Sequence, residues 1–247
     1  MIPKTIHYCW FGHNPLPKSA IKCINSWRKF FPDYEIKEWN EDNFDVNIIP
    51  YTAEAYQVKK YAFVSDYARF WILYHYGGVY FDTDVEVINP MNDIVAKGAF
   101  MGIEVEAGKD NAYPLVAPGL GIAVEPKHPF YYKLLNYYLG IHFLNEDGSL
   151  NQMTVVRHTS RLLVEEGMIS DNQLQCVSGI WIYPKDYFNP LDDFTGRLSI
   201  TSNTRTIHWY SRTWQKHSPV KQWLSRMSHR IFGMHLHYLK KIMKYKF

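Results

Sequence analysis

The run from Gly77 to Val87 constrains this chain more than any other segment, because apolar and polar residues alternate along it. Its odd positions are apolar: Val79, Phe81, Val85 and Val87. Its even positions are polar: Tyr80, Asp82, Asp84 and Glu86. The alternation predicts one extended strand whose acidic face carries successive carboxylates roughly 7 Å apart. Such a row of like charges is unfavourable unless water or a cation screens it.

Two interpretations of Asp82 and Asp84 follow. Paired carboxylates just after a buried strand are typical ligands for a divalent ion that also binds phosphates. An edge strand with a solvated acidic face fits the run equally well. A calcium-binding loop that begins at Asp82 is excluded, because its sixth position is Val87 where a glycine is required.

Length and composition indicate a large domain with a cleft for flat rings. The 247 residues suffice for one large domain, or for one domain with an appendage. Aromatic residues make up 17% of the chain, with 8 Trp and 19 Tyr, which suits the stacking of bases and sugars.

The three cysteines, Cys9, Cys23 and Cys176, are scattered and form no CxxC pair. They indicate a reducing compartment, without a disulfide framework or a zinc site. The first residues have neither the charged leader nor the apolar run of a signal peptide, and no stretch has the length of a membrane span. We therefore expect a cytoplasmic protein.

Charge is distributed unevenly between the body and the carboxyl-terminal segment. Residues 216–247 contain eight of the 27 Lys and Arg residues and none of the 24 Asp and Glu, together with many aromatic residues. This composition predicts a body over 1–215 and a tail over 216–247. The tail would associate peripherally with the anionic inner face of the cell membrane. The alternative is a helix packed on the acidic body, and that acidity argues against nucleic-acid binding.

The pattern of the remaining chain predicts alternating strands and helices. We expect strands at 5–12, 34–39, 98–104, 119–124 and 205–210, and helices from 18, from 52, and over 61–76, 129–139 and 152–167. This order predicts an α/β sheet, mostly parallel, that is covered on both faces and binds ligands beyond the carboxyl ends of its strands. Because the sequence has no P-loop and no GxGxxG turn, a metal and basic side chains would neutralise phosphates.

Asp66 and Arg69 lie three residues apart, so they share one face of the 61–76 helix and would pair with each other. Because they lie just before the acidic run, they are also candidate site residues. SerAspTyrAlaArgPhe (65–70), TyrGlyGlyValTyrPheAspThrAspVal (76–85) and IleHisTyrCysTrpPheGly (6–12) together resemble the DXD-containing glycosyltransferases of family 32. That family includes the yeast initiating α-1,6-mannosyltransferase and bacterial capsular and lipopolysaccharide sugar transferases, and it is distantly related to clostridial toxin glucosyltransferases.

The resemblance implies a GT-A-type, Rossmann-like mixed sheet flanked by helices, and a set of site residues. The implied catalytic residues are Asp66, Arg69, Asp82 and Asp84. The implied donor-binding residues are Trp10, Ser65, Asp66, Arg69, Tyr80, Asp82, Thr213 and Trp214. Trp10 would stack on the base, Tyr80 and Asp82 would contact the ribose, and Thr213 and Trp214 would lie near the β-phosphate. The implied metal ligands are Asp84, Asp82 and His208, of which His208 belongs to a segment that departs from the family pattern at Arg212 and Thr213.

The function implied is a metal-dependent, retaining transfer of a hexose from a nucleotide sugar to a glycan acceptor. UDP-galactose is the favoured donor, Mn²⁺ or Mg²⁺ the cofactor, and a lipid-linked molecule or an oligosaccharide the acceptor, in bacterial capsule, exopolysaccharide or lipopolysaccharide synthesis. The alternatives are a nucleotidyltransferase that makes nucleotide sugars and a non-catalytic nucleotide-sugar or carbohydrate-binding module. Glu104, Glu106 and Asp110 are candidates for the acceptor side, although we expect each to be a surface loop charge.

Overall fold

A computed structural model describes residues 1–211 and 227 of the chain. The predicted division at residue 215 and the predicted tail therefore lie outside the described residues, apart from Met227. Thr213 and Trp214, which are expected near the β-phosphate, lie outside them as well. In the described part, no helix is both long enough and apolar enough to cross a membrane.

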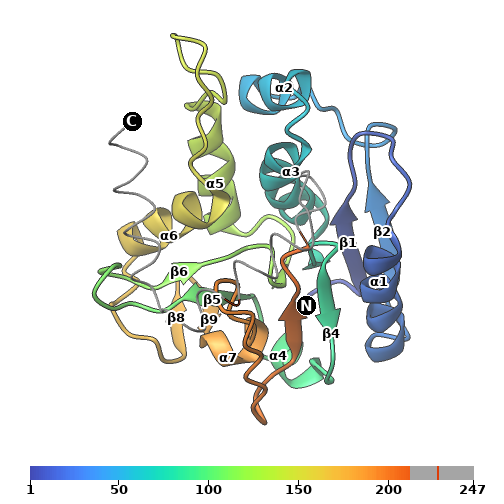
Figure 1. Cartoon of the computed structure of the whole chain (residues 1–247), viewed down its shortest axis with the longest axis vertical. Helices are drawn as coiled ribbons and strands as arrows, with labels where there is room; N and C mark the ends of the chain where they lie inside the picture. The colour runs from blue at the N-terminus through green and yellow to red at the C-terminus, as the bar shows by residue number, and fades with distance from the viewer. Residues whose placement is uncertain (212–226, 228–247) are drawn as a thin grey trace.

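The larger sheet of the described residues has eight strands (Figure 1). Seven follow one another in space in this order: β2 (Glu35–Trp39), β1 (Thr5–Cys9), β3 (Gly78–Tyr80), β7 (Ile122–Val124), β5 (Phe100–Val105), β9 (Ile180–Tyr183) and β8 (Gln175–Val177). The eighth, β6 (Leu115–Val116), pairs with β5. Pairs β1–β2, β1–β3 and β5–β9 are parallel, whereas β7 runs antiparallel to both β3 and β5. The mixed sheet is thus confirmed. The prediction of mostly parallel pairing is wrong, because β7, β6 and β8 each run against their neighbours.

The acidic run does not form one strand. It supplies β3 to the larger sheet and β4 (Val85–Val87) to a second, two-stranded sheet, in which β4 pairs antiparallel with β10 (Thr206–His208). Between the two strands the chain turns, and the Val85 amide donates to the Asp82 carbonyl over 3.0 Å. The Asp82 amide donates to the Gly119 carbonyl over 3.1 Å, so the backbone leaves the β1 side of the sheet at the first aspartate.

The apolar half of the predicted alternation is confirmed. Val79, Phe81, Val85 and Val87 are all buried in one core cluster. Helix α1 (Lys18–Phe30) covers this cluster, and the Trp27 indole donates to the Val85 carbonyl over 2.8 Å. Two short helices, α4 (Asn92–Lys97) and α7 (Lys185–Phe188), contribute to the same side.

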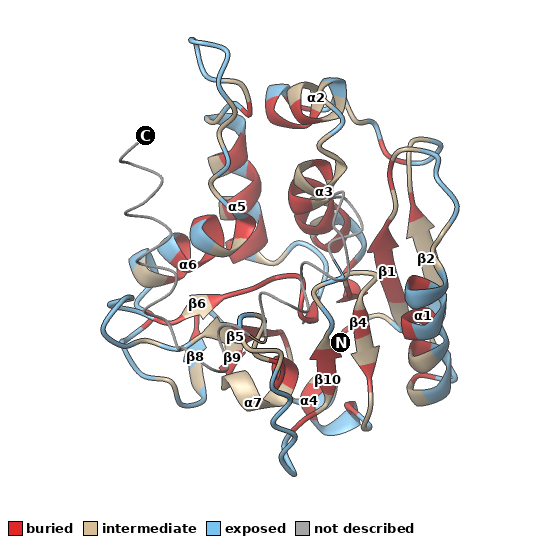
Figure 2. Cartoon of the chain, in the orientation of Figure 1, coloured by how far each residue is buried: buried red, intermediate tan, exposed pale blue. Residues whose placement is uncertain are grey.

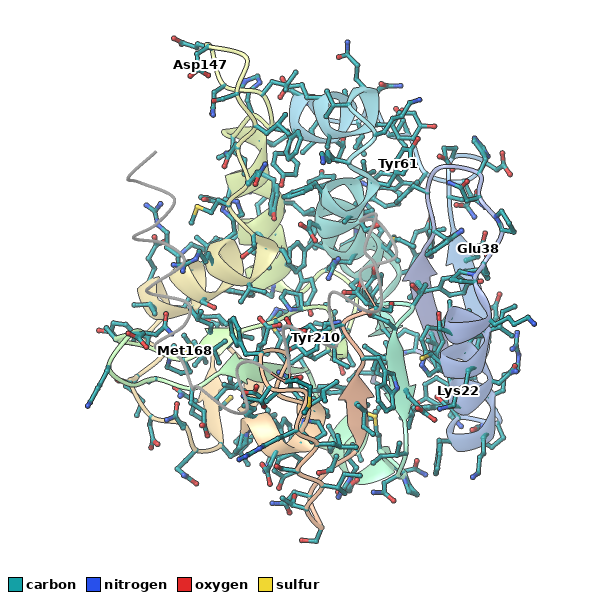
Figure 3. All side chains as sticks on the ribbon, viewed as in Figure 1. Lys22, Glu38, Tyr61, Asp147, Met168 and Tyr210 are labelled. Atoms are coloured by element: carbon teal, nitrogen blue, oxygen red, sulfur yellow. The ribbon has the colours of Figure 1, made fainter. Side chains whose placement is uncertain are left out.

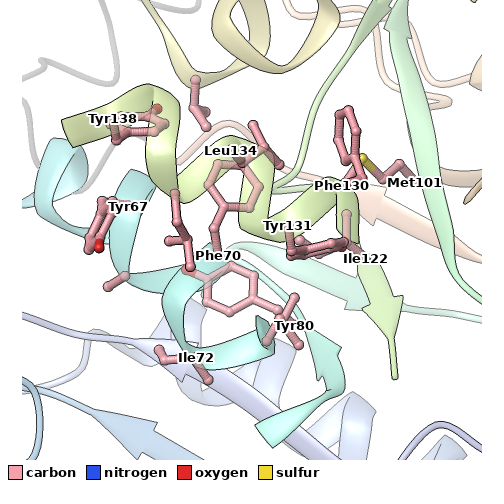
Figure 4. Packing of buried hydrophobic residues seen from close by; sticks show 14 of the residues in the cluster. Tyr67, Phe70, Ile72, Tyr80, Met101, Ile122, Phe130, Tyr131, Leu134 and Tyr138 are labelled. Atoms are coloured by element: carbon pink, nitrogen blue, oxygen red, sulfur yellow. The ribbon is translucent and has the colours of Figure 1, made fainter. Parts of the chain in front are cut away.

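A second, larger core lies on the other face of the sheet. Four helices supply it: α2 (Pro50–Gln57), α3 (Tyr61–Tyr76), α5 (Pro129–Leu139) and α6 (Val155–Glu165). Figure 4 shows Phe70 of α3 among Tyr131, Leu134 and Tyr80, which come from α5 and β3. Full burial of each such side chain stabilises the fold by about 1.5–3 kcal/mol. Buried segments accordingly run through α3 and β1 at the centre of Figure 2.

Gly77 ends α3 and reverses the chain into β3. Its φ is +65°, and a Cβ there would lie 2.7 Å from Cδ of Pro126 and 2.9 Å from Cδ of Pro3. Only glycine meets both demands, the left-handed backbone and the close approach. The predicted helices 61–76 and 129–139 match α3 and α5, whereas the sequence pattern gave no indication of β8, β9 or α7.

Candidate active site

The carboxyl ends of β1 and β3 meet at one edge of the sheet, because these strands run parallel with His7 opposite Tyr80. A pocket of about 720 Å³ opens there. Predicted site residues from four segments line it together: Trp10, Ser65, Asp66, Arg69, Asp82, Asp84 and His208. The structure therefore brings these residues to one cavity, as the ends of a parallel strand pair require.

Arg69 forms the buried centre of one wall. Its Nη2 lies 2.9 Å from Asp66 Oδ1 and 3.3 Å from Asp82 Oδ1, and its Nε donates to the Ser65 carbonyl over 3.0 Å. The guanidinium also lies 5.0 Å from the centre of the Tyr80 ring. One cation thus holds two carboxylates in fixed positions beside the pocket.

Burial and charge act in opposite directions on this group. Burial raises the pKa of Asp66 to about 7, and the attraction of Arg69 offsets only part of that effect. Burial also favours loss of the Arg69 proton, but Asp82, Tyr80 and Asp66 outweigh it and raise the Arg69 pKa. Arg69 therefore stays charged, and its two carboxylates give the wall a net negative character when both are ionised.

Tyr80 supports this wall from behind. It is 1% exposed, and its hydroxyl donates to Asp82 Oδ1 over 3.0 Å. Tyr80 is not among the residues that line the pocket, and its predicted contact with a ribose stays a prediction. Tyr80 positions Asp82.

Asp84 and His208 form a second wall of the pocket. His208 Nε2 lies 3.2 Å from Asp84 Oδ1, and the amide and hydroxyl of Ser211 donate to Asp84 Oδ2 over 2.9 and 3.2 Å. Burial would raise the Asp84 pKa, but His208 and Ser211 lower it to about 2. Burial would lower the His208 pKa, but Asp84 raises it to about 9. Asp84 and His208 therefore form an ion pair at neutral pH.

The three predicted metal ligands fit a metal in type but do not converge. Among the described residues, no group of three or more His, Cys, Asp or Glu side chains is arranged to hold a metal ion. The reason is that Asp82 faces Arg69 and Tyr80, while Asp84 faces His208. Carboxylate and imidazole donors suit Mn²⁺, and Asp84 and His208 would hold it once His208 has lost its proton. His208 Nδ1 is buried and has no hydrogen-bond partner among the described residues.

Two residues of the pocket, Gly119 and Tyr210, were not predicted as site residues from the sequence. Gly119 lies against Asp82, and a Cβ there would be 2.0 Å from Asp82 Oδ2. Tyr210 packs on His208 with ring centres 4.1 Å apart and lines the pocket. The sequence shows Gly119 only as the start of an expected strand, whereas residues 117–121 in fact precede β7 as a loop.

Glu86, which the resemblance leaves without a role, joins the second wall to α1. Its Oε2 accepts from the Trp209 indole over 2.8 Å and from Lys22 Nζ over 3.0 Å. Figure 3 labels Lys22 on α1, at the edge of the molecule. Glu86 and Lys22 thus secure the residue that follows His208.

Comparison with known proteins agrees with the resemblance. Residues 17–101 match the family model described as the glycosyltransferase sugar-binding region containing DXD motif. The chain is 30% identical over 146 residues to inositol phosphoceramide mannosyltransferase 1 of Schizosaccharomyces pombe, a match that covers 55% of this chain and 42% of that protein. It is 24% identical over 168 residues to mannosyl phosphorylinositol ceramide synthase CSH1 of Saccharomyces cerevisiae, covering 66% of this chain and 42% of the relative. The chain thus spans less than half the length of these two relatives.

Solved structures give a looser likeness. The galactosyltransferase LgtC, in complex with donor and acceptor sugar analogues, has 13% identity and a TM-score of 0.46, covering 90% of this chain and 93% of its own. The PaToxG glycosyltransferase has 20% identity and a TM-score of 0.48, covering 67% and 70%. The sequence matches agree with the resemblance that the motifs indicated, since residues 17–101 are similar to the sugar-binding region of the DXD glycosyltransferases.

Proposed function

We propose that this chain is a GT-A-type glycosyltransferase that transfers a hexosyl group from a nucleotide sugar to an acceptor hydroxyl with retention of configuration. The observation that carries the proposal is that two groups, Asp66–Arg69–Asp82 and Asp84–His208, line one pocket. Trp10 lines the same pocket and offers a flat ring for a base.

The acidic and basic residues of the pocket have different roles in the proposed reaction. Asp66 and Asp82 accept hydrogen bonds from hydroxyls of the donor, and Arg69 fixes both carboxylates. A bound Mn²⁺ or Mg²⁺ would supply stabilisation for the negative charge of the departing nucleoside diphosphate. Asp84 and His208 are the residues that we propose to hold it.

For the donor we propose a UDP-sugar, with galactose first. The names of two relatives include mannosyl transfer, which makes GDP-mannose the second candidate. For the acceptor we propose a lipid-linked molecule or an oligosaccharide in bacterial surface polysaccharide synthesis. Because the same names contain inositol phosphoceramide and phosphorylinositol ceramide, an inositol-bearing lipid is the second candidate.

We further propose that residues 216–247 associate with the anionic inner face of the cell membrane, where a lipid-linked acceptor resides. The support is their charge and aromatic content. The test is sedimentation with anionic liposomes. The full chain should sediment and a chain ending at 215 should not, and equal binding of both would refute the anchoring role.

The decisive experiment is release of nucleoside diphosphate from a panel of UDP- and GDP-sugars with Mn²⁺. We expect one donor to dominate, and Asp84→Ala to abolish its turnover. Release of pyrophosphate from a nucleoside triphosphate would favour the nucleotidyltransferase instead. Donor binding by calorimetry without turnover would favour a non-catalytic binding module.

A further inference from the structure

The pocket contains four carboxylates, and one of them differs from the rest. Asp66 and Asp82 pair with Arg69, and Asp84 pairs with His208. The fourth, Glu104, also lines the pocket. Within the part of the chain that the structure describes, Glu104 forms no ion pair with a Lys, Arg or His side chain.

Glu104 is nevertheless held in place. It lies near the end of β5, and its Oε1 accepts from the Tyr210 hydroxyl over 3.2 Å. That hydroxyl in turn accepts from Asn189 Nδ2 over 2.7 Å. Figure 3 labels Tyr210 near the centre of the molecule, and its ring covers His208. Glu104 is therefore fixed by Tyr210, the residue whose ring packs on His208.

This placement is unfavourable for the fold alone. Burial raises the pKa of Glu104, and the nearby His208 offsets only part of that cost. A half-buried carboxylate that lacks a paired cation and faces a cleft is the kind of group that serves a ligand. Glu106, two residues further on, is exposed and outside the pocket. The expectation that Glu104 is a surface loop charge is therefore wrong, whereas it holds for Glu106 and Asp110.

We propose that the Glu104 carboxylate binds the acceptor, by accepting a hydrogen bond from a hydroxyl of a neutral sugar or polyol. This inference rests on the proposed function and adds the acceptor side of the site. A carboxylate attracts hydroxyl donors and repels anions, so the acceptor ring that enters here carries no phosphate or carboxylate beside the reacting hydroxyl. A phosphate elsewhere in the acceptor would lie away from β5.

The test compares two nucleophiles that attack the same donor: water and the hydroxyl of an acceptor. First, the hydrolysis by water of the donor that the wild type turns over is measured without any acceptor. Three neutral probes are then added in turn: myo-inositol, methyl α-mannoside and methyl β-galactoside. Glu104→Gln has the same shape, keeps an oxygen for the Tyr210 hydroxyl and lacks the charge. Glu106→Gln is the matched control.

We expect Glu104→Gln to change the hydrolysis rate and the donor KM much less than it lowers transfer. Transfer to the best probe should fall about tenfold or more through a higher acceptor KM, which is the effect of losing one charge-assisted hydrogen bond. Glu106→Gln should change neither rate. Thermal unfolding of both variants checks that the fold is intact.

Other outcomes would overturn the inference. Hydrolysis and transfer falling in the same proportion would assign Glu104 to the donor side or to packing. Unchanged transfer in Glu104→Gln, or a wild type that hydrolyses its donor but uses none of the three probes, would also contradict it while leaving the proposed function standing. A wild type that hydrolyses no donor would overturn both.

Discussion

The two walls of the pocket are built differently, although only Thr83 separates Asp82 from Asp84 in the sequence. Asp82 is held by groups close to it in sequence, since Arg69 is 13 residues away and Tyr80 only two. Asp84 is held by His208 and by Ser211, which lies 127 residues away. The first wall belongs to the larger sheet and its buried helix α3, and the second to the two-stranded sheet.

This difference teaches where stability and binding reside. Arg69 is 3% exposed and its ion pairs are part of the core, so changes there disturb the whole fold. The second wall is closed by a single short strand, β10, with three residue pairs to β4. We therefore expect changes in the first wall to lower the free energy of unfolding, and changes in the second to reduce turnover with a smaller loss of stability.

Arg69→Leu should have the largest effect. It leaves Asp66 and Asp82 without their cation in a buried setting, which costs about 3–5 kcal/mol of unfolding free energy, and it abolishes turnover. Denaturant unfolding measures the first effect. Arg28→Leu, at an exposed position on α1, is the control and should cost little. Equal losses in the two variants would erase the contrast between the walls.

Asp84→Asn should reduce turnover strongly and lower the free energy of unfolding only modestly. The side chain keeps its size but loses the charge that holds His208, so nucleoside diphosphate release should fall about 100-fold or more. Its unfolding free energy should fall by less than that of Arg69→Leu. Parallel activity and denaturation curves check this, and a stability loss as large as that of Arg69→Leu would show that both walls belong to the core.

Acid should destabilise the first wall through His7, which lies in β1 beneath it. The Trp39 indole donates to His7 Nδ1 and the imidazole Nε2–H donates to the Gly77 carbonyl, each over 3.0 Å, so the ring must be neutral. Burial lowers the His7 pKa to about 4, below its ordinary 6.5. Because the unfolded chain then binds the proton more tightly, stability is full above pH 6.5 and is lost as the pH falls towards 4, by up to about 3 kcal/mol.

Unfolding at several pH values tests this prediction. His158, whose pKa burial also lowers to about 4, contributes in the same window, so His7→Gln should reduce the acid-induced loss of stability and the double variant with His158→Gln should reduce it further. His75→Gln, on the exposed side of α3, is the control. An acid-induced loss of stability that His7→Gln leaves unchanged would contradict the assignment.

Gly119→Ala should have an intermediate effect confined to Asp82. The new methyl group would meet the Asp82 carboxylate, which must turn away from Arg69 and Tyr80, at a cost of about 1–3 kcal/mol. Donor affinity should fall with it, as calorimetry would show. Gly108→Ala is the matched control, because nothing lies within 4 Å of a Cβ there. A wild-type donor affinity in Gly119→Ala would show that Asp82 is not a donor ligand.

Lys22→Met should have the smallest effect. The pair between Lys22 and Glu86 lies at the surface, so its loss costs about 1 kcal/mol or less. Because Glu86 still accepts from the Trp209 indole, β10 stays in place and donor KM should change less than twofold. Trp209→Phe removes that indole bond, and a larger rise in donor KM there than in Lys22→Met would show that Glu86 acts on the second wall through Trp209.

Sequence patterns predicted the elements of this protein whose cause is local. The apolar helix 61–76 and its end at Gly77, the helix 129–139 and the buried odd positions of the acidic run all follow from periodicity and from glycine or proline at a boundary. The pairing of Asp66 with Arg69 follows from their spacing of three.

Strand partners depend on segments that are distant in sequence, so they could not be predicted in the same way. The insertion of β7 between β3 and β5 makes the sheet mixed, and the pairing of β4 with β10 breaks the predicted strand at the two aspartates. The same long-range pairing turns Asp82 and Asp84 to different partners, which no alternation of side chains reveals.

The sequence by itself therefore determined which carboxylates and which arginine are candidates for the site, because their types and spacing are local properties. The tertiary structure decided how those groups are divided between two walls, and it alone brought Gly119 and Tyr210 to the pocket. The physical reason is that strand order and loop placement are set by the burial of whole faces against one another, to which these two residues contribute no local pattern.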